Sequence, residues 1–402
     1  MAKRWNRIEV VVGLIVLGIG GILLGVAGLW IYRSATASPL HPDALQMPSA
    51  AQAAPAEKWR GAVNRAREAM RASVAEQNLP GLSVAVAVDG DLVWAEGFGF
   101  ADIESKAPVT PDTRFRIGTM STVLTSAAAG LLIEQQQLKL DEPIRTYVPE
   151  FPDTSFPVTV RHLMNHTAGV RNDSGDEGEL FGKHCERPIE GVQHVADENL
   201  RFEPGTQYRF SNYSWIMVSA AIESAAREPF LTFMQRRLFD PLRMDGTLSD
   251  SLTEPIQDRA TPYFPKFASD PRYGPDPMRD IDLSCYAGAG VFVSTPSDLV
   301  RFVVAIKSGK VLKPETVELL QTSQKLSSGQ DTGYGLGWDL ETVTVAGRQT
   351  RWIGHDGDIL GGVAGSLATL PEHRLVIAVL ANISYSDAPA LALKVANAFV
   401  RP

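Results

Sequence analysis

The longest uninterrupted apolar stretch lies at the N-terminus. Residues 10–32, from Val10 to Tyr32, carry no charge, and a helix needs only ~20 residues to cross the hydrocarbon core of a bilayer. Lys3, Arg4 and Arg7 precede the stretch, and basic flanks stay in the cytoplasm. The pattern predicts a cytoplasmic segment over residues 1–9 and a transmembrane signal anchor over residues 10–32, with the rest of the chain extracytoplasmic. In a two-membrane bacterium that compartment is the periplasm.

A cleaved signal peptide is the alternative interpretation of this stretch. Residues 35–37, Ala-Thr-Ala, form a small-residue cleavage site. However, the apolar core of a signal peptide is usually about 7–15 residues long, which is shorter than residues 10–32. Both interpretations place the C-terminal part of the chain outside the cytoplasm.

The next segments alternate between irregular and periodic patterns. Residues 33–56 are rich in Ala, Pro and Ser without amphipathic period, which predicts a flexible linker. Apolar residues then recur at helical spacing over residues 57–77, and Pro80-Gly81 ends that helix. Two strand-like runs, residues 82–88 and 92–98, flank Asp89-Gly90, which is a type I′ hairpin signal.

The centre of the chain is predicted to be helical. Residues 120–137 are apolar nearly all round, which is typical of a helix buried inside a protein. Residues 141–330 alternate helices with Pro- and Gly-rich loops, and one such helix covers residues 215–227.

Strand patterns return near the C-terminus. Expected strands cover residues 335–340, 342–345, 363–370 and 374–381, with a turn at 371–373 and a closing helix at 388–400. We therefore predict an α/β fold of the α+β sandwich kind: an antiparallel sheet from N- and C-terminal segments, flanked by helices, with a helix-rich insertion over about 141–330. The globular domain is assigned to residues 57–402.

Composition narrows the choice of function. The net charge is −8, and no long basic run lies outside the N-terminus, so nucleic-acid binding has little support. The seven His residues are scattered, so we expect no metal site and no cofactor. Cys185 and Cys285 are the only cysteines. In an oxidising compartment they can form a disulfide, although two separate buried thiols remain the alternative.

Seven short motifs in a fixed order resemble the serine β-lactamase and penicillin-binding protein family. The resemblance is strongest to the class C, D-Ala-D-Ala carboxypeptidase and esterase branch, and to its mitochondrial β-lactamase-like relatives. The motifs occupy residues 115–118, 163–169, 204–212, 294–299, 335–338, 354–357 and 381–382. The match runs from about residue 60 to the C-terminus and implies the same α/β sandwich.

The family's first catalytic motif is Ser-x-x-Lys at the start of the buried helix. Serine attacks an acyl carbon, and lysine one turn later lies on the same face within reach of the hydroxyl. Here the motif is Thr119-Met-Ser-Thr122. Thr119 keeps a hydroxyl on a stiffer side chain, whereas Thr122 has no basic nitrogen.

The second motif, Tyr-x-Asn, corresponds to Phe210-Ser-Asn212. The resemblance implies that Asn212 holds substrate, while the proton-shuttling phenol is gone. Tyr208 and Tyr213 lie two and three residues away, and neither inherits the geometry automatically.

The third motif, Lys-Thr-Gly or His-x-Gly, corresponds to His355-Asp-Gly357 on the strand that edges the site. The resemblance implies that His355 supports the substrate carboxylate or the proton network, and Gly357 lets a ligand approach the backbone. His166 belongs to a motif that the resemblance makes structural. Residues 322–325 offer hydroxyl-x-x-Lys only in polar surroundings, as expected for a surface turn.

The resemblance therefore implies a hydrolase site that has lost both of its bases. A hydroxyl nucleophile needs an adjacent base, so we expect a catalytically impaired, membrane-tethered protein whose cleft, with Asn212, His355 and Gly357, binds a ligand. Expected partners are a peptidoglycan-like peptide, a β-lactam or ester, or a protein. The alternatives are an active hydrolase of an ester, amide or β-lactam that uses Thr119 with a rewired base, and a scaffold whose cleft has no ligand.

Overall fold

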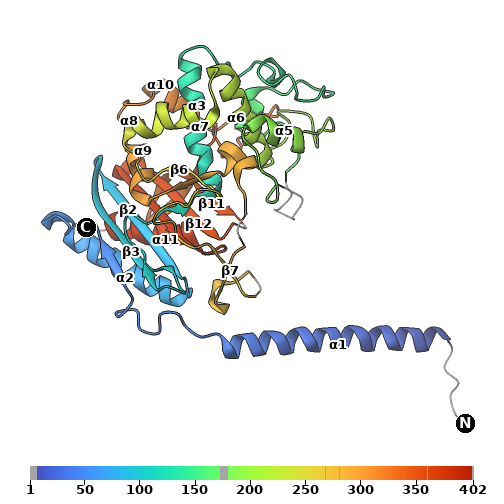
Figure 1. Ribbon diagram of the computed structural model, residues 1–402, viewed down its shortest axis with the longest axis vertical. Coiled ribbons are helices and arrows are strands. Elements are labelled where there is room, and N and C mark those ends of the chain that lie inside the picture. The colour runs from blue at the N-terminus through green and yellow to red at the C-terminus, as the bar shows by residue number, and fades with distance from the viewer. Residues whose placement is uncertain (1–6, 173–179, 268, 280, 360, 401–402) are drawn as a thin grey trace, which may run out of the picture.

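The computed structural model describes residues 7–172, 180–267, 269–279, 281–359 and 361–400. Lys3 and Arg4, part of the basic segment predicted before the anchor, lie outside the described residues. The N-terminal helix α1 spans Arg7–Thr36. Within it, Leu14–Tyr32 is long and apolar enough to cross a membrane, and that stretch is not buried by the rest of the chain. Figure 1 shows α1 standing apart from the sheet and its helices.

One large antiparallel sheet organises the domain. Its eight strands follow the order β1-β3-β2-β13-β12-β11-β10, with β4 paired to β3. The strands are β1 Ser49–Ala51, β2 Gly81–Val88, β3 Asp91–Asp102, β4 Ala107–Pro108, β10 Asp339–Val345, β11 Arg348–Ile359, β12 Val363–Leu370 and β13 Leu375–Ala381. Since β2 pairs with β13, N-terminal and C-terminal segments form one sheet, which confirms the predicted fold class.

Apolar side chains cover both faces of this sheet. Leu82, Val84 and Val86 of β2 pack with α2 (Arg60–Glu76) and α11 (Ala388–Val400), whereas Ala85 and Ala87 face the opposite core. That second core contains α3 (Ser121–Glu134) and α9 (Pro296–Lys307). The alternation follows from the two-residue period of a strand.

The insertion between the two halves of the sheet is richer in strands than the sequence predicts. Besides helices it contains a three-stranded sheet ordered β5-β9-β6 and a two-stranded pair, β7-β8. These strands are β5 Phe115–Arg116, β6 Leu248–Ser249, β7 Tyr263–Pro265, β8 Pro275–Pro277 and β9 Phe292–Ser294. The helices are α4 Val160–Met164, α5 Pro188–Val195, α6 Asn212–Ala226, α7 Phe230–Met234, α8 Asp240–Leu242 and α10 Pro314–Leu320. Strands of two or three residues carry too little alternation to stand out in a sequence pattern.

Local predictions are confirmed at several places. Asp89 and Gly90 both have positive φ, 57° and 90°, as a type I′ turn requires. The buried helix begins with a single 3-10 turn, η2 (Gly118–Met120), and continues as α3. The strand expected over residues 335–340 is wrong in its first part, because Gly337 takes a φ of 97° and β10 begins only at Asp339.

The predicted linker is largely bound to the domain. Ser49–Ala51 forms the edge strand β1 against β3, and the ring of His41 is buried with Nε2 3.1 Å from the carbonyl oxygen of Leu79. An Ala- and Pro-rich composition is also that of a flexible linker. Only the pairing with the sheet edge distinguishes this bound segment from a flexible one.

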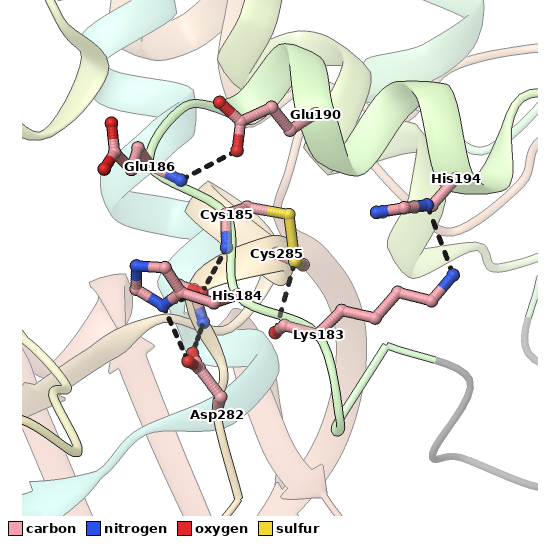
Figure 2. The surroundings of a disulfide bond; sticks show 9 residues. Lys183, His184, Cys185, Glu186, Glu190, His194, Asp282 and Cys285 are labelled. Carbon is pink, nitrogen blue, oxygen red and sulfur yellow. Dashed lines mark hydrogen bonds and ion pairs between the residues drawn. A yellow bond between two sulfur atoms is a disulfide. The ribbon is translucent and has the colours of Figure 1, made fainter.

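Cys185 and Cys285 are joined by a disulfide that closes a separation of 100 residues. Figure 2 shows the bond beside an exposed ion pair in which Nδ1 of His184 lies 2.8 Å from Oδ2 of Asp282. The hydrogen bond and charge of Asp282 raise the pKa of His184. The disulfide thus links the loop before α5 to η6 (Ser284–Ala289).

Candidate functional site

Thr119 lies in the 3-10 turn that leads into α3. Gly118 precedes it with a φ of 52°, in the left-handed region that favours glycine. The Thr119 side chain is mostly buried, and its hydroxyl donates to the carbonyl oxygen of Asp356 at 3.0 Å. The hydroxyl at the family's nucleophile position is therefore bound to the backbone of β11.

Thr122 lies one turn further along and is fully buried. Its hydroxyl donates to the carbonyl oxygen of Thr119 at 2.8 Å. The Tyr334 hydroxyl lies beside the side chains of Thr122 and Trp215. The neutral side chains of Thr122, Tyr334 and Trp215 thus meet at the place where the resemblance implies the ammonium group of a lysine.

His355 is buried on β11 between two hydrogen-bond partners. Its Nδ1 lies 2.6 Å from the carbonyl oxygen of Asp356, and its Nε2 lies 3.1 Å from the Tyr334 hydroxyl. A carbonyl oxygen only accepts, so Nδ1 carries the ring hydrogen and Nε2 accepts from Tyr334. The basic nitrogen of His355 therefore faces Tyr334.

Tyr334 is the residue that the sequence analysis missed. It is fully buried, and burial, followed by the charge of Asp339, raises the pKa of its phenol well above the usual value. A phenol with a raised pKa stays protonated and acts as a donor rather than a base. Its position directly before the Gly335–Trp338 motif is the sequence signal that could have singled it out.

The two tyrosines that neighbour position 210, Tyr208 and Tyr213, lie in different surroundings. Tyr213 is buried with the guanidinium of Arg171 5.0 Å from its ring centroid. Tyr208 is 37% exposed, and burial of part of the ring together with the charge of Asp339 raises its pKa. Its ring centroid lies 5.8 Å from that of Tyr334.

Phe210 and Asn212 flank the start of α6. The Phe210 ring centroid lies 4.3 Å from that of His166 and 6.2 Å from that of His355. The Asn212 backbone N–H donates to Oδ1 of Asn172 at 2.8 Å, whereas Oδ1 of Asn212 is buried without a hydrogen-bond partner among the described residues. The retained amide thus keeps one acceptor unsatisfied.

His166 holds the segment that carries these two residues. It is buried, and its Nδ1 accepts from the Ser211 backbone N–H at 3.1 Å. Its carbonyl oxygen accepts from the Arg209 backbone N–H at 2.9 Å. Burial holds the pKa of His166 well below its usual value, so the ring is neutral. These contacts match the packing and capping role expected for it.

Gly357 allows close packing between β11 and the η2 turn. A Cβ at this position would lie 2.5 Å from the carbonyl oxygen of Ile117 and 3.2 Å from a Met120 methyl carbon. The start of the buried helix therefore approaches the Gly357 backbone on the side of its Cβ position.

Asp356 places a titratable carboxyl next to these groups. Burial, which is the largest cause, raises its pKa to about 6, and the charges of Asp339 and Glu341 act in the same direction. Oδ1 of Asp356 is buried, and no described residue forms a hydrogen bond with it. Among the residues described by the structure, no cluster of three or more His, Cys, Asp or Glu side chains could hold a metal ion.

Comparison with known proteins matches residues 66–400 to the family model described as beta-lactamase. The chain is 26% identical to the mitochondrial serine beta-lactamase-like protein LACTB of Mus musculus, over 91% of this chain and 86% of the mouse protein. It is also 26% identical to penicillin-binding protein 4* of Bacillus subtilis (strain 168), over 75% of this chain and 67% of that protein.

Solved structures agree in fold. The octameric penicillin-binding protein homologue from Pyrococcus abyssi aligns with a TM-score of 0.69 at 24% identity, over 82% of this chain and 76% of that one. The D-amino acid amidase from Ochrobactrum anthropi SV3 aligns with a TM-score of 0.69 at 23% identity, over 84% and 98%. At these identities the likeness concerns the fold alone.

Proposed function

Because the chain belongs to the beta-lactamase family of serine hydrolases, we propose that it is a membrane-anchored member with impaired hydrolytic chemistry and a retained ligand site. The observation that carries the proposal is the partner of the Thr119 hydroxyl. That hydroxyl donates to a backbone carbonyl of β11, and a carbonyl oxygen is not a base that can activate a nucleophile.

The groups around Thr119 support this proposal. The Nδ1–H of His355 donates to the same carbonyl oxygen, so His355 presents a donor on that side. Thr122 supplies no nitrogen, and the raised pKa of Tyr334 keeps its phenol protonated. In an unrelated serine hydrolase, loss of the nucleophile or its base lowers the rate roughly 10⁶-fold.

A retained ligand site is supported by what the substitutions leave in place. Within the part of the chain that the structure describes, no group donates to the buried amide oxygen of Asn212, and His355 keeps its position on β11. Groups that hold a ligand are distinct from those that break its bond, so binding without turnover is physically reasonable. The proposed ligands are a peptidoglycan-like peptide, a β-lactam or ester, or a protein partner.

Restoring the family residues tests the proposal. The full-length chain and its Thr119→Ser, Thr122→Lys, Phe210→Tyr variant are incubated with a fluorescent penicillin and a fluorophosphonate, and the intact mass is measured. We expect an adduct on the triple variant alone. An adduct at Thr119 of the unchanged chain would instead establish the alternative function, a hydrolase with a rewired base.

Ligand retention needs its own measurement. The melting temperature of the unchanged chain is recorded against increasing benzylpenicillin and a D-Ala-D-Ala peptide, because a ligand that binds only the folded state raises it. We expect a saturable rise that His355→Ala abolishes. Absence of any rise would contradict binding of these two ligand classes.

The anchor is proposed from the Leu14–Tyr32 span of α1 and the basic residues before it, which favour a cytoplasmic N-terminus. The Cys185–Cys285 disulfide supports an oxidising compartment for the domain. An alkaline phosphatase fused after Pro402 is active only outside the cytoplasm, so we expect activity. An inactive but intact fusion would contradict this topology.

A further inference from the structure

The chain between α1 and the domain is short and closely held. α1 ends at Thr36, and the Leu40 backbone N–H already donates to Oδ1 of Asn78 at 2.7 Å. Nδ2 of the same Asn78 donates to the carbonyl oxygens of Ser38 and Arg272, at 3.4 Å each. One side chain thus ties the exit from α1 to the β7–β8 hairpin.

Further contacts hold the residues that follow against the domain, so they do not form a flexible linker. The His41 ring stacks on Phe100 with centroids 5.4 Å apart, and β1 pairs with β3. The guanidinium of Arg71 donates to three carbonyl oxygens of this segment, those of Ala44, Leu45 and Met47. The segment from Ser38 to Ala51 is therefore part of the domain surface.

Chain geometry limits how far this surface can lie from a membrane that contains α1. From Tyr32 to Thr36 the helix rises about 6 Å, and four extended residues from Thr36 to Leu40 reach at most about 14 Å. Leu40 therefore lies within about 20 Å of the end of the apolar span. The headgroup region occupies about 5–8 Å of that distance. Asn78 and the hairpin backbone at Arg272 must remain close to the headgroups.

Aromatic side chains gather on this hairpin and beside it. Phe264, Phe267 and Tyr273 are only partly buried, and Tyr385 is 38% exposed. Phe264 lies edge-on to Tyr385, and Phe267 lies edge-on to Tyr273, with centroids 5.5 Å apart in both pairs. Tyr rings are enriched at the level of lipid headgroups, and Phe side chains lie on the apolar face of helices that bind a membrane surface. We call these four residues the aromatic patch.

The charges on the hairpin are largely compensated. Arg272 lies 2.7 Å from a carboxylate oxygen of Asp270, and Lys266 lies 3.9 Å from one of Asp276. The hairpin therefore offers no strong net charge to an acidic protein or an anionic lipid. Its aromatic rings and the aliphatic stems of Lys266 and Arg272 suit the boundary between headgroups and acyl chains.

We infer that the aromatic patch rests on the surface of the membrane that contains α1. This inference rests on the proposed membrane anchor. Figure 1 shows the β7 hairpin on the side of the domain toward α1. The hairpin also backs onto the start of β12, since a Cβ on Gly362 would lie 2.5 Å from Pro262. Docking therefore holds the start of β12 near the lipid surface.

The test measures the depth of single labels on the full-length chain. Phe267→Cys and Tyr385→Cys carry a nitrobenzoxadiazole dye in vesicles of phosphatidylcholine with a minority of phosphatidylglycerol, and the native disulfide stays oxidised. The quencher is a nitroxide on the lipid headgroup. Leu92→Cys is the matched control: Leu92 is 40% exposed and pairs with Ala87, about 20 Å along β2 from Gly81.

We expect quenching at positions 267 and 385 to be several-fold stronger than at position 92. Two positions are labelled in separate variants. A variant whose melting temperature is unchanged is folded, and one such variant is enough to decide the result. Equal and weak quenching at all three positions overturns membrane docking while the anchor stands. Release of the chain from the vesicles by alkaline carbonate overturns the anchor and, with it, the docking.

Discussion

The hydroxyl of Thr119 and the Nδ1–H of His355 donate to one acceptor, the carbonyl oxygen of Asp356, over 3.0 Å and 2.6 Å. Two candidate catalytic groups thus face the same backbone oxygen instead of each other. A general base must lie within hydrogen-bond reach of the proton that it removes. This shared acceptor is the arrangement on which the proposed impairment of hydrolysis rests.

Replacing Tyr334 tests the other side of His355. Tyr334→Phe removes the donor to Nε2 and leaves a buried acceptor unsatisfied, which costs about 1–3 kcal/mol of unfolding free energy. We expect a loss of this size in urea-induced unfolding. Tyr208→Phe is the control, because Tyr208 is partly exposed, and it should cost much less. Equal losses in the two variants would contradict a special role for the Tyr334 hydroxyl.

Asp356 predicts a pH-dependent stability. Its pKa rises from 3.8 to about 6 in the fold, so the folded state binds more protons between those values. Stability from this group is present below about pH 4 and is lost as the pH rises through about 6. We expect Asp356→Asn to raise the unfolding free energy by about 3 kcal/mol at pH 7.5.

The same variant measured at about pH 3 provides the control, because this pH lies below the ordinary pKa of 3.8. Asp356 is then mostly protonated in both states, and the gain should nearly vanish. Chemical denaturation of both proteins across this range gives the difference curve. A gain that does not change with pH would show that Asp356 does not titrate as described.

The close packing at Gly357 predicts a steric penalty. In Gly357→Ala the new Cβ would lie 2.5 Å from the Ile117 carbonyl oxygen, so β11 and the η2 turn must separate. Overpacking of this kind costs about 1–3 kcal/mol, which we expect to appear as a lower melting temperature. Gly182→Ala is the control, because no atom of the described residues, its chain neighbours apart, lies within 4 Å of its Cβ position, and it should be nearly neutral. A neutral Gly357→Ala would contradict this packing.

The Cys185–Cys285 disulfide predicts sensitivity to reduction. Its closed loop separates the two residues by 100 positions, and removing such a link costs about 2–5 kcal/mol. We expect Cys185→Ser, Cys285→Ser to unfold at a lower temperature, and dithiothreitol to lower the melting temperature of the unchanged chain alone. A reductant effect of equal size in both proteins would assign the loss to another cause.

The segment from Ser38 to Ala51 is part of the domain surface, so a truncated chain without α1 should keep it. Cutting at residue 57 would remove β1 and the His41 and Arg71 contacts. We expect a chain beginning at Ser38 to have a higher melting temperature than one beginning at Glu57, with circular dichroism as the measurement. Equal melting temperatures would show that the segment adds no stability.

The local residue chemistry and the spacing of apolar residues were enough to predict several elements of this protein from its sequence alone. An uncharged apolar stretch, an Asp-Gly turn and a helix that is apolar all round depend on neighbouring residues, so they predicted α1, the β2–β3 hairpin and α3. The ordered motifs located Thr119, Thr122, Phe210, Asn212 and His355. These features depend on local pattern and order, which a sequence records directly.

Only the tertiary structure decided how those residues meet. Whether the Thr119 hydroxyl faces a base or a carbonyl depends on the register of β11 against the η2 turn, and those segments lie more than 200 residues apart. Tyr334 reaches His355, and Ser38 reaches Arg272 through Asn78, only because the sheet joins distant segments. Hydrogen-bond partners are set by distances of a few ångströms, and no local sequence pattern encodes them.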